Sequence, residues 1–93
     1  MPSKKRERLE VIKDILRAIR ESRKIKPTRL LYSSNLSPQM FKDYVTELLD
    51  KGFIKMEVEG KDENKKFFLI TKKGNDFLEQ YKSIETFIQN FGL

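Results

Sequence analysis

Residues 34–54, SNLSPQMFKDYVTELLDKGFI, decide the fold of this chain. The pair Ser37-Pro38 predicts the start of a helix, because a serine oxygen accepts a hydrogen bond from an unpaired amide and proline has no amide to leave unpaired. Gly52 predicts the end of that helix. Between them, apolar residues recur at the helical period, namely Phe41, Val45, Leu48 and Leu49. An amphipathic helix is therefore predicted from Ser37 to about Lys51.

A shorter helix is predicted just before it. Pro27 suits the first turn of a helix, and a segment from Thr28 to about Ser33 places Leu30 and Leu31 inward. Residues 33–35 then supply a polar turn. A short helix, a polar turn and a second helix with a hydrophilic outer face are the pattern of a helix-turn-helix, whose second helix can lie in the major groove of DNA.

The first twenty residues predict another amphipathic helix, over residues 3–22. Its apolar stripe consists of Leu9, Ile12, Ile15, Leu16 and Ile19. Its outer surface is basic and holds Lys4, Lys5, Arg6, Arg8, Lys13, Arg17 and Arg20. After it, Ile25 stands alone among basic residues and predicts a short edge strand.

After Gly52 the apolar period changes from helical to extended. Residues 54, 56 and 58 alternate with charged residues as a half-buried strand, residues 60–64 form a polar loop, and residues 66–70 form the returning strand. The element order predicts an α+β, mostly helical fold over residues 3–70. This fold is a winged helix, a helix-turn-helix followed by a two- or three-stranded hairpin sheet whose loop is the wing.

A last helix is predicted from about Lys72 to Asn90, with Thr71 as its cap and Gly92 beyond its end. The residues Phe77, Tyr81, Ile84, Ile88 and Phe91 are spaced four, three, four and three, as in the heptad seam of a coiled coil. We expect a homodimer through this helix, with an interface made of Phe77, Tyr81, Ile84, Phe87, Ile88 and Phe91. The alternative is that the stripe folds back onto the first helix of its own chain.

The composition restricts the classes of function. The 93 residues fit a single domain, with residues 3–70 as the body and 71–92 as a C-terminal helix. The chain has no histidine and no cysteine, which excludes disulfides, thiolate zinc sites and histidine acid–base chemistry. We therefore expect no catalytic residues, no metal and no cofactor. No apolar run approaches a membrane span, and Met1–Arg8 lacks the apolar segment of a secretory signal, so we expect a soluble, cytoplasmic protein.

The positive charge is concentrated at the front of the chain. The total is +6, but residues 1–30 carry eleven Lys and Arg against four Asp and Glu, a net +7, whereas residues 31–93 carry a net −1. Such asymmetry suits attraction to a polyanion, since neutralising phosphates releases counterions. The alternative is a solvated, lysine-rich surface that keeps a small protein in solution.

Two segments carry a resemblance to a known family. YVTELLDKGFI (44–54) and ITKKGNDFLEQY (70–81), together with the basic first helix and the charged wing, resemble the small archaeal winged helix-turn-helix proteins. The resemblance implies double-stranded DNA as a partner and a dimer joined by antiparallel C-terminal helices. It also implies a role as a transcription regulator or a chromatin-type architectural factor, associated with the nucleoid.

The resemblance also implies which residues touch DNA. The groove-reading helix corresponds to Ser37–Lys51. Its expected base-reading residues are Ser37, Gln39, Met40, Lys42, Asp43 and Thr46. The expected phosphate contacts are Lys4, Lys5, Arg6, Arg8, Arg20, Arg23, Lys24, Lys26, Thr28, Arg29, Lys61, Lys65 and Lys66.

The charge of the reading elements departs from this expectation. The reading helix carries a net −1 and the wing, residues 59–66, carries a net zero. Most of the attraction to phosphate is therefore expected from the first thirty residues. The competing hypothesis is a protein–protein interaction module within a larger assembly, which uses Asp43, Glu47 and Asp50 as an acidic face.

Overall fold

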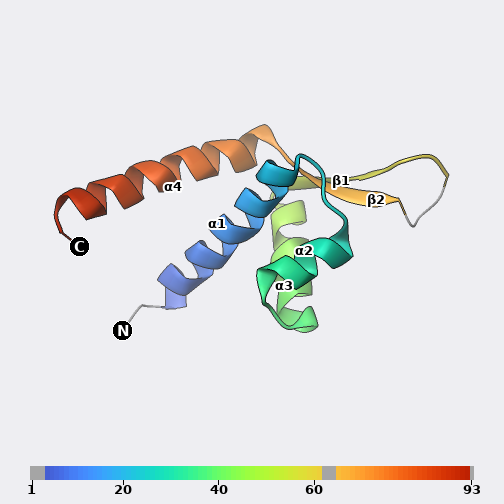
Figure 1. Ribbon diagram of the computed structural model, residues 1–93, viewed down its shortest axis with the longest axis horizontal. Coiled ribbons are helices and arrows are strands. Elements are labelled where there is room, and N and C mark those ends of the chain that lie inside the picture. The colour runs from blue at the N-terminus through green and yellow to red at the C-terminus, as the bar shows by residue number, and fades with distance from the viewer. Residues whose placement is uncertain (1–3, 62–64, 93) are drawn as a thin grey trace.

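The computed structural model describes residues 4–61 and 65–92, and the side chains from Glu7 onward within those ranges. The elements of the described residues are α1 (Lys4–Ser22), α2 (Pro27–Ser34), α3 (Pro38–Asp50), β1 (Ile54–Val58), β2 (Lys66–Ile70) and α4 (Lys72–Asn90). Their order confirms the predicted mostly helical winged helix. Figure 1 shows α4 and the β1–β2 hairpin extending in opposite directions from the three central helices, and the whole measures 52 × 26 × 21 Å.

The start and the end of α3 follow from the residues that predicted them. The backbone N–H of Met40 donates a 3.2 Å hydrogen bond to Oγ of Ser37, which caps the helix, and Pro38 occupies the first turn. At the other end Gly52 has a φ of 78°, a left-handed conformation that glycine adopts without steric cost. The preceding turn contains Asn35 at a φ of 57°, another residue type that tolerates this region. The helix-turn-helix is thus set by local signals.

The core lies where α1, α2, α3 and the base of the hairpin meet. Leu16, Ile19 and Leu30 are completely buried, and burial of such a side chain contributes about 1.5–3 kcal/mol. The prediction that Leu9 faces inward was wrong, since 42% of this residue is exposed. It lines an open hollow between α1, α3 and α4 instead of packing into the core.

The hairpin pairs β1 and β2 in an antiparallel register that runs from Ile54 opposite Ile70 to Val58 opposite Lys66. The predicted half-buried alternation holds only at Ile54. Met56 and Val58 are 40% and 48% exposed, because the hairpin projects past the helices (Figure 1), so its outer half has no core to face.

The short edge strand predicted around Ile25 is present as a single β-bridge to Phe68. The N–H of Ile25 donates to the carbonyl of Phe68 over 3.1 Å, and the N–H of Phe68 donates back over 2.8 Å. Both side chains are buried. The bridge ties the α1–α2 connection to β2 and so fixes the hairpin relative to the helix-turn-helix.

Helix α4 begins at Thr71, as predicted. The N–H of Gly74 donates a 3.2 Å hydrogen bond to the Thr71 hydroxyl oxygen, and that hydroxyl lies 2.9 Å from the carbonyl of Phe53. Gly74 is buried against the same segment, where a Cβ atom would lie 2.3 Å from the Phe53 carbonyl oxygen. Glycine thus permits the close approach of α4 to the start of the hairpin.

Only the first half of α4 packs on the body. Leu78 is buried in the core, whereas Ile84, Phe87 and Phe91 are 57%, 63% and 68% exposed. The alternative in which the whole stripe covers α1 therefore holds for Phe77 and Tyr81, and it does not hold for those three exposed residues. Among the described residues, α4 and the other helices lack the apolar length needed to cross a membrane.

Candidate nucleic-acid interface

All six predicted base-reading residues lie on the exposed face of α3 or at its cap. Their environments differ. Ser37 already uses its hydroxyl oxygen to cap the helix, and Nε2 of Gln39 donates a 3.0 Å hydrogen bond to Oδ1 of Asp43. Met40 is 48% exposed, and Lys42 and Thr46 are exposed. The structure therefore brings these side chains together on one surface, with Gln39 and Asp43 engaged with each other.

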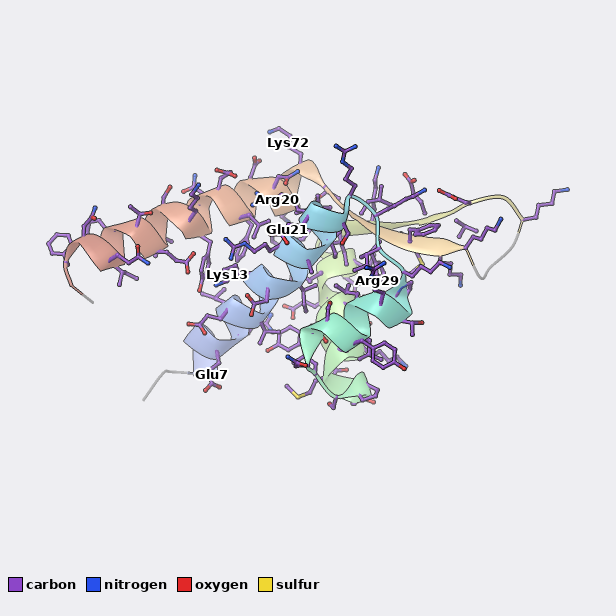
Figure 2. The ribbon with its side chains drawn as sticks, viewed as in Figure 1. Glu7, Lys13, Arg20, Glu21, Arg29 and Lys72 are labelled. Carbon is purple, nitrogen blue, oxygen red and sulfur yellow. The ribbon has the colours of Figure 1, made fainter. Side chains whose placement is uncertain are left out.

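The cations of α1 whose side chains are described, from Arg8 onward, form ion pairs with carboxylates of the same chain. Lys13 lies 3.5 Å from Glu85 of α4, and Arg20 donates a 3.2 Å hydrogen bond to Glu79 of α4. Figure 2 shows Lys13 and Arg20 on the side of α1 that faces α4. Arg17 is 4.0 Å from Glu21 within α1 itself. This part of the predicted basic field thus takes part in intramolecular ion pairs.

Arg8 and Lys24 are also paired. Arg8 contacts the carboxylate of Glu47 in α3 and lies 5.8 Å from the centroid of the Tyr44 ring. Lys24 contacts Glu59 at the base of the wing and lies 4.7 Å from the centroid of the Phe67 ring. The hydrogen bond from Lys24 holds the pKa of Glu59 below its ordinary value. Binding of phosphate to either cation requires competition with a carboxylate.

The carboxylate of Glu47 accepts hydrogen bonds from two cations. Lys51 Nζ donates to it over 2.8 Å, and Arg8 donates to the same Oε1 atom. The hydrogen bond from Lys51, followed by that from Arg8, lowers the pKa of Glu47. Glu47 is half-buried against α1, so it does not share the fully exposed surface of Asp43 and Asp50. The acidic face expected from the sequence is reduced to those two residues.

A second group of cations makes no ion pair with a carboxylate of the described residues, although the charge of Lys65 helps to lower the pKa of Glu59. Within the described ranges, no carboxylate lies at ion-pair distance from six residues of the predicted phosphate-contact set. They occupy the α1–α2 connection, the first turn of α2 and the wing. These residues are Arg23, Lys26, Arg29, Lys61, Lys65 and Lys66.

The first turn of α2 lies beside an open cavity of about 360 Å³, which is lined by Ser22, Lys24, Ile25, Lys26, Arg29 and Phe67. Lys26, the residue before the helix, makes no side-chain cap. The amides of the first turn, including those of Thr28 and Arg29, therefore have no partner within the helix. Unpaired amides at a helix start together with cations favour binding of an anion such as phosphate.

Three predicted phosphate contacts lie outside this description, because the side chains of Lys4, Lys5 and Arg6 are not among the described ones. The same is true of residues 62–64, between Lys61 and Lys65.

The sequence patterns did not identify one exposed aromatic residue as part of the candidate site. Tyr32 of α2 is 78% exposed, and its only signal was an aromatic residue at the polar end of a short helix.

The predicted dimer residues of α4 form a graded stripe. Phe77, Tyr81 and Ile88 are half-buried. Nζ of Lys13 lies 5.2 Å from the centroid of the Tyr81 ring. Ile84, Phe87 and Phe91 are exposed, with the rings of Phe87 and Phe91 4.9 Å apart. The stripe is therefore available along the outer half of α4.

The fold agrees with comparisons to known proteins. The profile of the winged helix-turn-helix family matches residues 5–89, and the chain belongs to this family. The uncharacterized protein MJ0290 of the archaeon Methanocaldococcus jannaschii is 31% identical over 84 residues, which are 90% of this chain and 36% of MJ0290. MJ0287 of the same organism is 40% identical over 70 residues, 75% of this chain and 64% of MJ0287. The chain thus spans about a third of one relative and just under two thirds of the other.

Solved structures show the same fold at lower identity. Sso10a-2, a DNA-binding protein from Sulfolobus solfataricus, superposes with a TM-score of 0.71 at 23% identity, over 89% of this chain and 82% of that one. A mutant of MarR from E. coli, complexed with operator DNA, gives a TM-score of 0.67 at 20% identity, over 80% of this chain and 57% of that one. The predicted resemblance to archaeal winged helix-turn-helix proteins is confirmed at the level of family and fold.

Proposed function

We propose that this protein binds duplex DNA, with α3 in the major groove and with phosphates held by the start of α2 and by the wing. One observation carries the proposal. Among the described side chains, the expected phosphate-contact cations without an ion-pair partner lie at the start of α2 and in the wing, whereas Lys13 and Arg20 of α1, which face α4, are paired. In a helix-turn-helix, the first of the two helices lies over the backbone while the second enters the groove. The unpaired charge therefore stands where this geometry requires it.

The phosphate contacts assigned to this surface are Lys26, Thr28 and Arg29 at the start of α2, Arg23 before it, and the wing lysines. A phosphate can accept from the orphan amides of the first turn as well as from the Arg29 guanidinium. Arg8, Arg20 and Lys24 contribute less, because each must leave a carboxylate. Among the described residues of the first thirty, the attraction to phosphate is therefore assigned mainly to residues 23–29, and the wing adds to it.

Base reading is assigned to the exposed face of α3. Lys42 can donate to guanine, and the methyl group of Thr46 can contact thymine. Gln39 can pair with adenine only after its 3.0 Å hydrogen bond to Asp43 opens. The side chain of Asp43 would then need a cytosine amino group or solvent. We expect the preference for a particular DNA sequence to be modest, since Lys42 is the single cation among the base-reading residues of α3.

We further propose that each chain forms a single domain and that two copies associate through the outer half of α4. The exposed Ile84, Phe87 and Phe91 form an apolar surface on a helix that extends past its own core. A dimer doubles the number of phosphate contacts. Two similar structures support a DNA role: Sso10a-2 is a DNA-binding protein, and a mutant of MarR is complexed with operator DNA. A transcription regulator and a nucleoid-associated architectural factor of the cytoplasm both fit this geometry.

Fluorescence anisotropy with arbitrary labelled duplexes tests DNA binding. Neutralising about six phosphates per protomer predicts that the logarithm of the affinity falls with the logarithm of salt concentration with a slope of about −5. Arg29→Gln should reduce both the affinity and the slope, the latter by about 1. The matched control is Arg17→Gln, which removes a paired cation of α1. No binding at low salt, or equal losses in the two variants, would contradict the proposal.

A second candidate function is a protein-interaction module. It is favoured by the exposed Tyr32 in α2, together with Asp43 and Asp50 on α3. This function predicts that Arg29→Glu leaves the cellular phenotype unchanged while Tyr32→Ala and Asp50→Lys alter it. The DNA-binding function predicts the opposite pattern, so complementation by the three variants in a deletion strain separates the two.

A further inference from the structure

An open hollow lies where α1, α3 and the first turns of α4 meet. Its volume is about 280 Å³. The floor is apolar and is formed by side chains from three helices and the α3–β1 connection. These side chains are Leu9, Ile12, Leu48, Phe53 and Phe77. The rings of Phe53 and Phe77 stand edge to face, with centroids 5.8 Å apart.

The rim of the hollow carries an excess of positive charge. Arg8, Lys51 and Lys73 border it, with Glu47 as its one carboxylate. Both Arg8 and Lys51 donate to that carboxylate. Two of the three cations therefore share a single anion at the edge of an apolar floor, and Lys73 is bonded to a backbone carbonyl instead. An anion placed there gains from a surplus charge of the opposite sign in partly desolvated surroundings.

Lys73 is the cation without an acidic partner. Its Nζ donates a 2.7 Å hydrogen bond to the backbone carbonyl of Lys51, and it lies 4.6 Å from the centroid of the Phe53 ring. In the described part of the chain, no carboxylate pairs with it. The ammonium group is thus held over the hollow by a carbonyl and an aromatic face, with further donors available.

We propose that this hollow is a binding site for a small carboxylic acid with an apolar body, such as an aromatic or a medium-chain acid. The carboxylate would accept from Lys73 and from Lys51 or Arg8, and the body would lie against Phe53, Phe77 and Leu9. The volume is near the lower end of the roughly 300–1,000 Å³ typical of small-molecule sites, which suits one ring. The proposed site shares only Arg8 with the expected phosphate contacts, and it is tested without DNA.

The probe is benzoate, titrated into the intact ¹⁵N-labelled protein and followed by NMR. We expect saturable shifts at the amides of Lys51, Phe53 and Phe77 with a dissociation constant in the millimolar range. Benzyl alcohol has the same ring without the charge, and we expect it to bind about tenfold more weakly, because charge-assisted hydrogen bonds are lost.

Substitutions of Lys73 distinguish binding of benzoate in the hollow from nonspecific binding to the protein surface. Lys73→Gln should weaken benzoate binding about tenfold, and Lys73→Arg should retain it. The matched control is Lys72→Gln on the same turn, because the Lys72 side chain is 92% exposed and pairs with Asp76. This control should leave the affinity unchanged.

Several results would overturn the site. They are equal binding of benzoate and benzyl alcohol, equal affinity in Lys73→Gln and the unaltered protein, and shifts centred on Ile84–Phe91 instead of the hollow. Absence of any shift at about 10 mM benzoate would have the same effect. So would concentration-dependent shifts at Phe53 and Phe77 without benzoate, because a second copy of the chain would then cover the hollow.

Discussion

The guanidinium of Arg20 in α1 donates a 3.2 Å hydrogen bond to the carboxylate of Glu79 in α4, across 59 positions of sequence. Both side chains are well exposed, at 38% and 68%. Exposed pairs of this kind contribute about 0.2–1 kcal/mol and are screened by salt. The contact therefore orients α4 on α1 more than it stabilises the fold.

This relationship predicts the outcome of a double-mutant cycle. Arg20→Ala, Glu79→Ala and the double variant should give a coupling free energy of about 0.2–1 kcal/mol at low salt, falling towards zero at about 1 M salt. Urea unfolding at both salt concentrations measures it. A coupling above about 2 kcal/mol, or one that does not change with salt, would show that the pair acts as a buried one.

Gly74→Ala should destabilise the protein although it lies in a helix. Alanine gains up to about 1 kcal/mol in helix propensity. The added Cβ, however, would lie 2.3 Å from the Phe53 carbonyl oxygen and 2.6 Å from Cγ1 of Ile70, so α4 must move away from β2. Overpacking of this kind costs about 1–3 kcal/mol. Denaturant unfolding should show a net loss, with Gln80→Ala on the exposed face of α4 as the neutral control; a gain for Gly74→Ala would refute the close approach.

The ion pairs of Glu47 predict a pH dependence of stability. Lys51 and Arg8 hold the pKa of this carboxyl below its ordinary value of 4.5. A group whose pKa is depressed by folding stabilises the folded state above its unfolded pKa, and this stability is lost as the pH falls through the folded pKa. The difference in unfolding free energy between the unaltered protein and Glu47→Gln should thus be present at pH 7 and shrink below about pH 4. A difference independent of pH would exclude these pairs as its source.

The exposed stripe of α4 predicts self-association. Sedimentation velocity of the unaltered protein at micromolar concentration should give a dimer, and Ile84→Glu should give a monomer, because it places a charge in the centre of the stripe. Thr86→Glu adds the same charge two residues further on, where the helical rotation of about 200° places it on the opposite, exposed side of α4, and it should leave the dimer intact. A monomeric unaltered protein, or a dimeric Ile84→Glu variant, would rule out this interface.

The sequence by itself determined the elements and their order. The predicted helix ends and strand are present in the structure. Ser37 caps α3, Thr71 caps α4, Gly52 is left-handed after α3, and the extended period of residues 66–70 corresponds to β2. These signals could be found in the sequence because caps, turns and apolar periods depend on residues that are neighbours along the chain. The family and the mostly helical winged fold follow from them.

Only the tertiary structure decided which parts of those elements are covered and which charges remain available. Met56 and Leu9 fit their apolar periods, but both are partly exposed, since a period gives the face of an element and not how far the core extends along it. The sequence predicted Arg8, Arg20 and Lys24 as phosphate contacts. In the folded chain each of them pairs with a carboxylate that is 39, 59 or 35 positions away, respectively. Coulomb attraction depends on distance through space. The paired cations of α1 and the cations without an ion pair at α2 and in the wing, all among the described residues, could therefore be told apart only after the chain was folded.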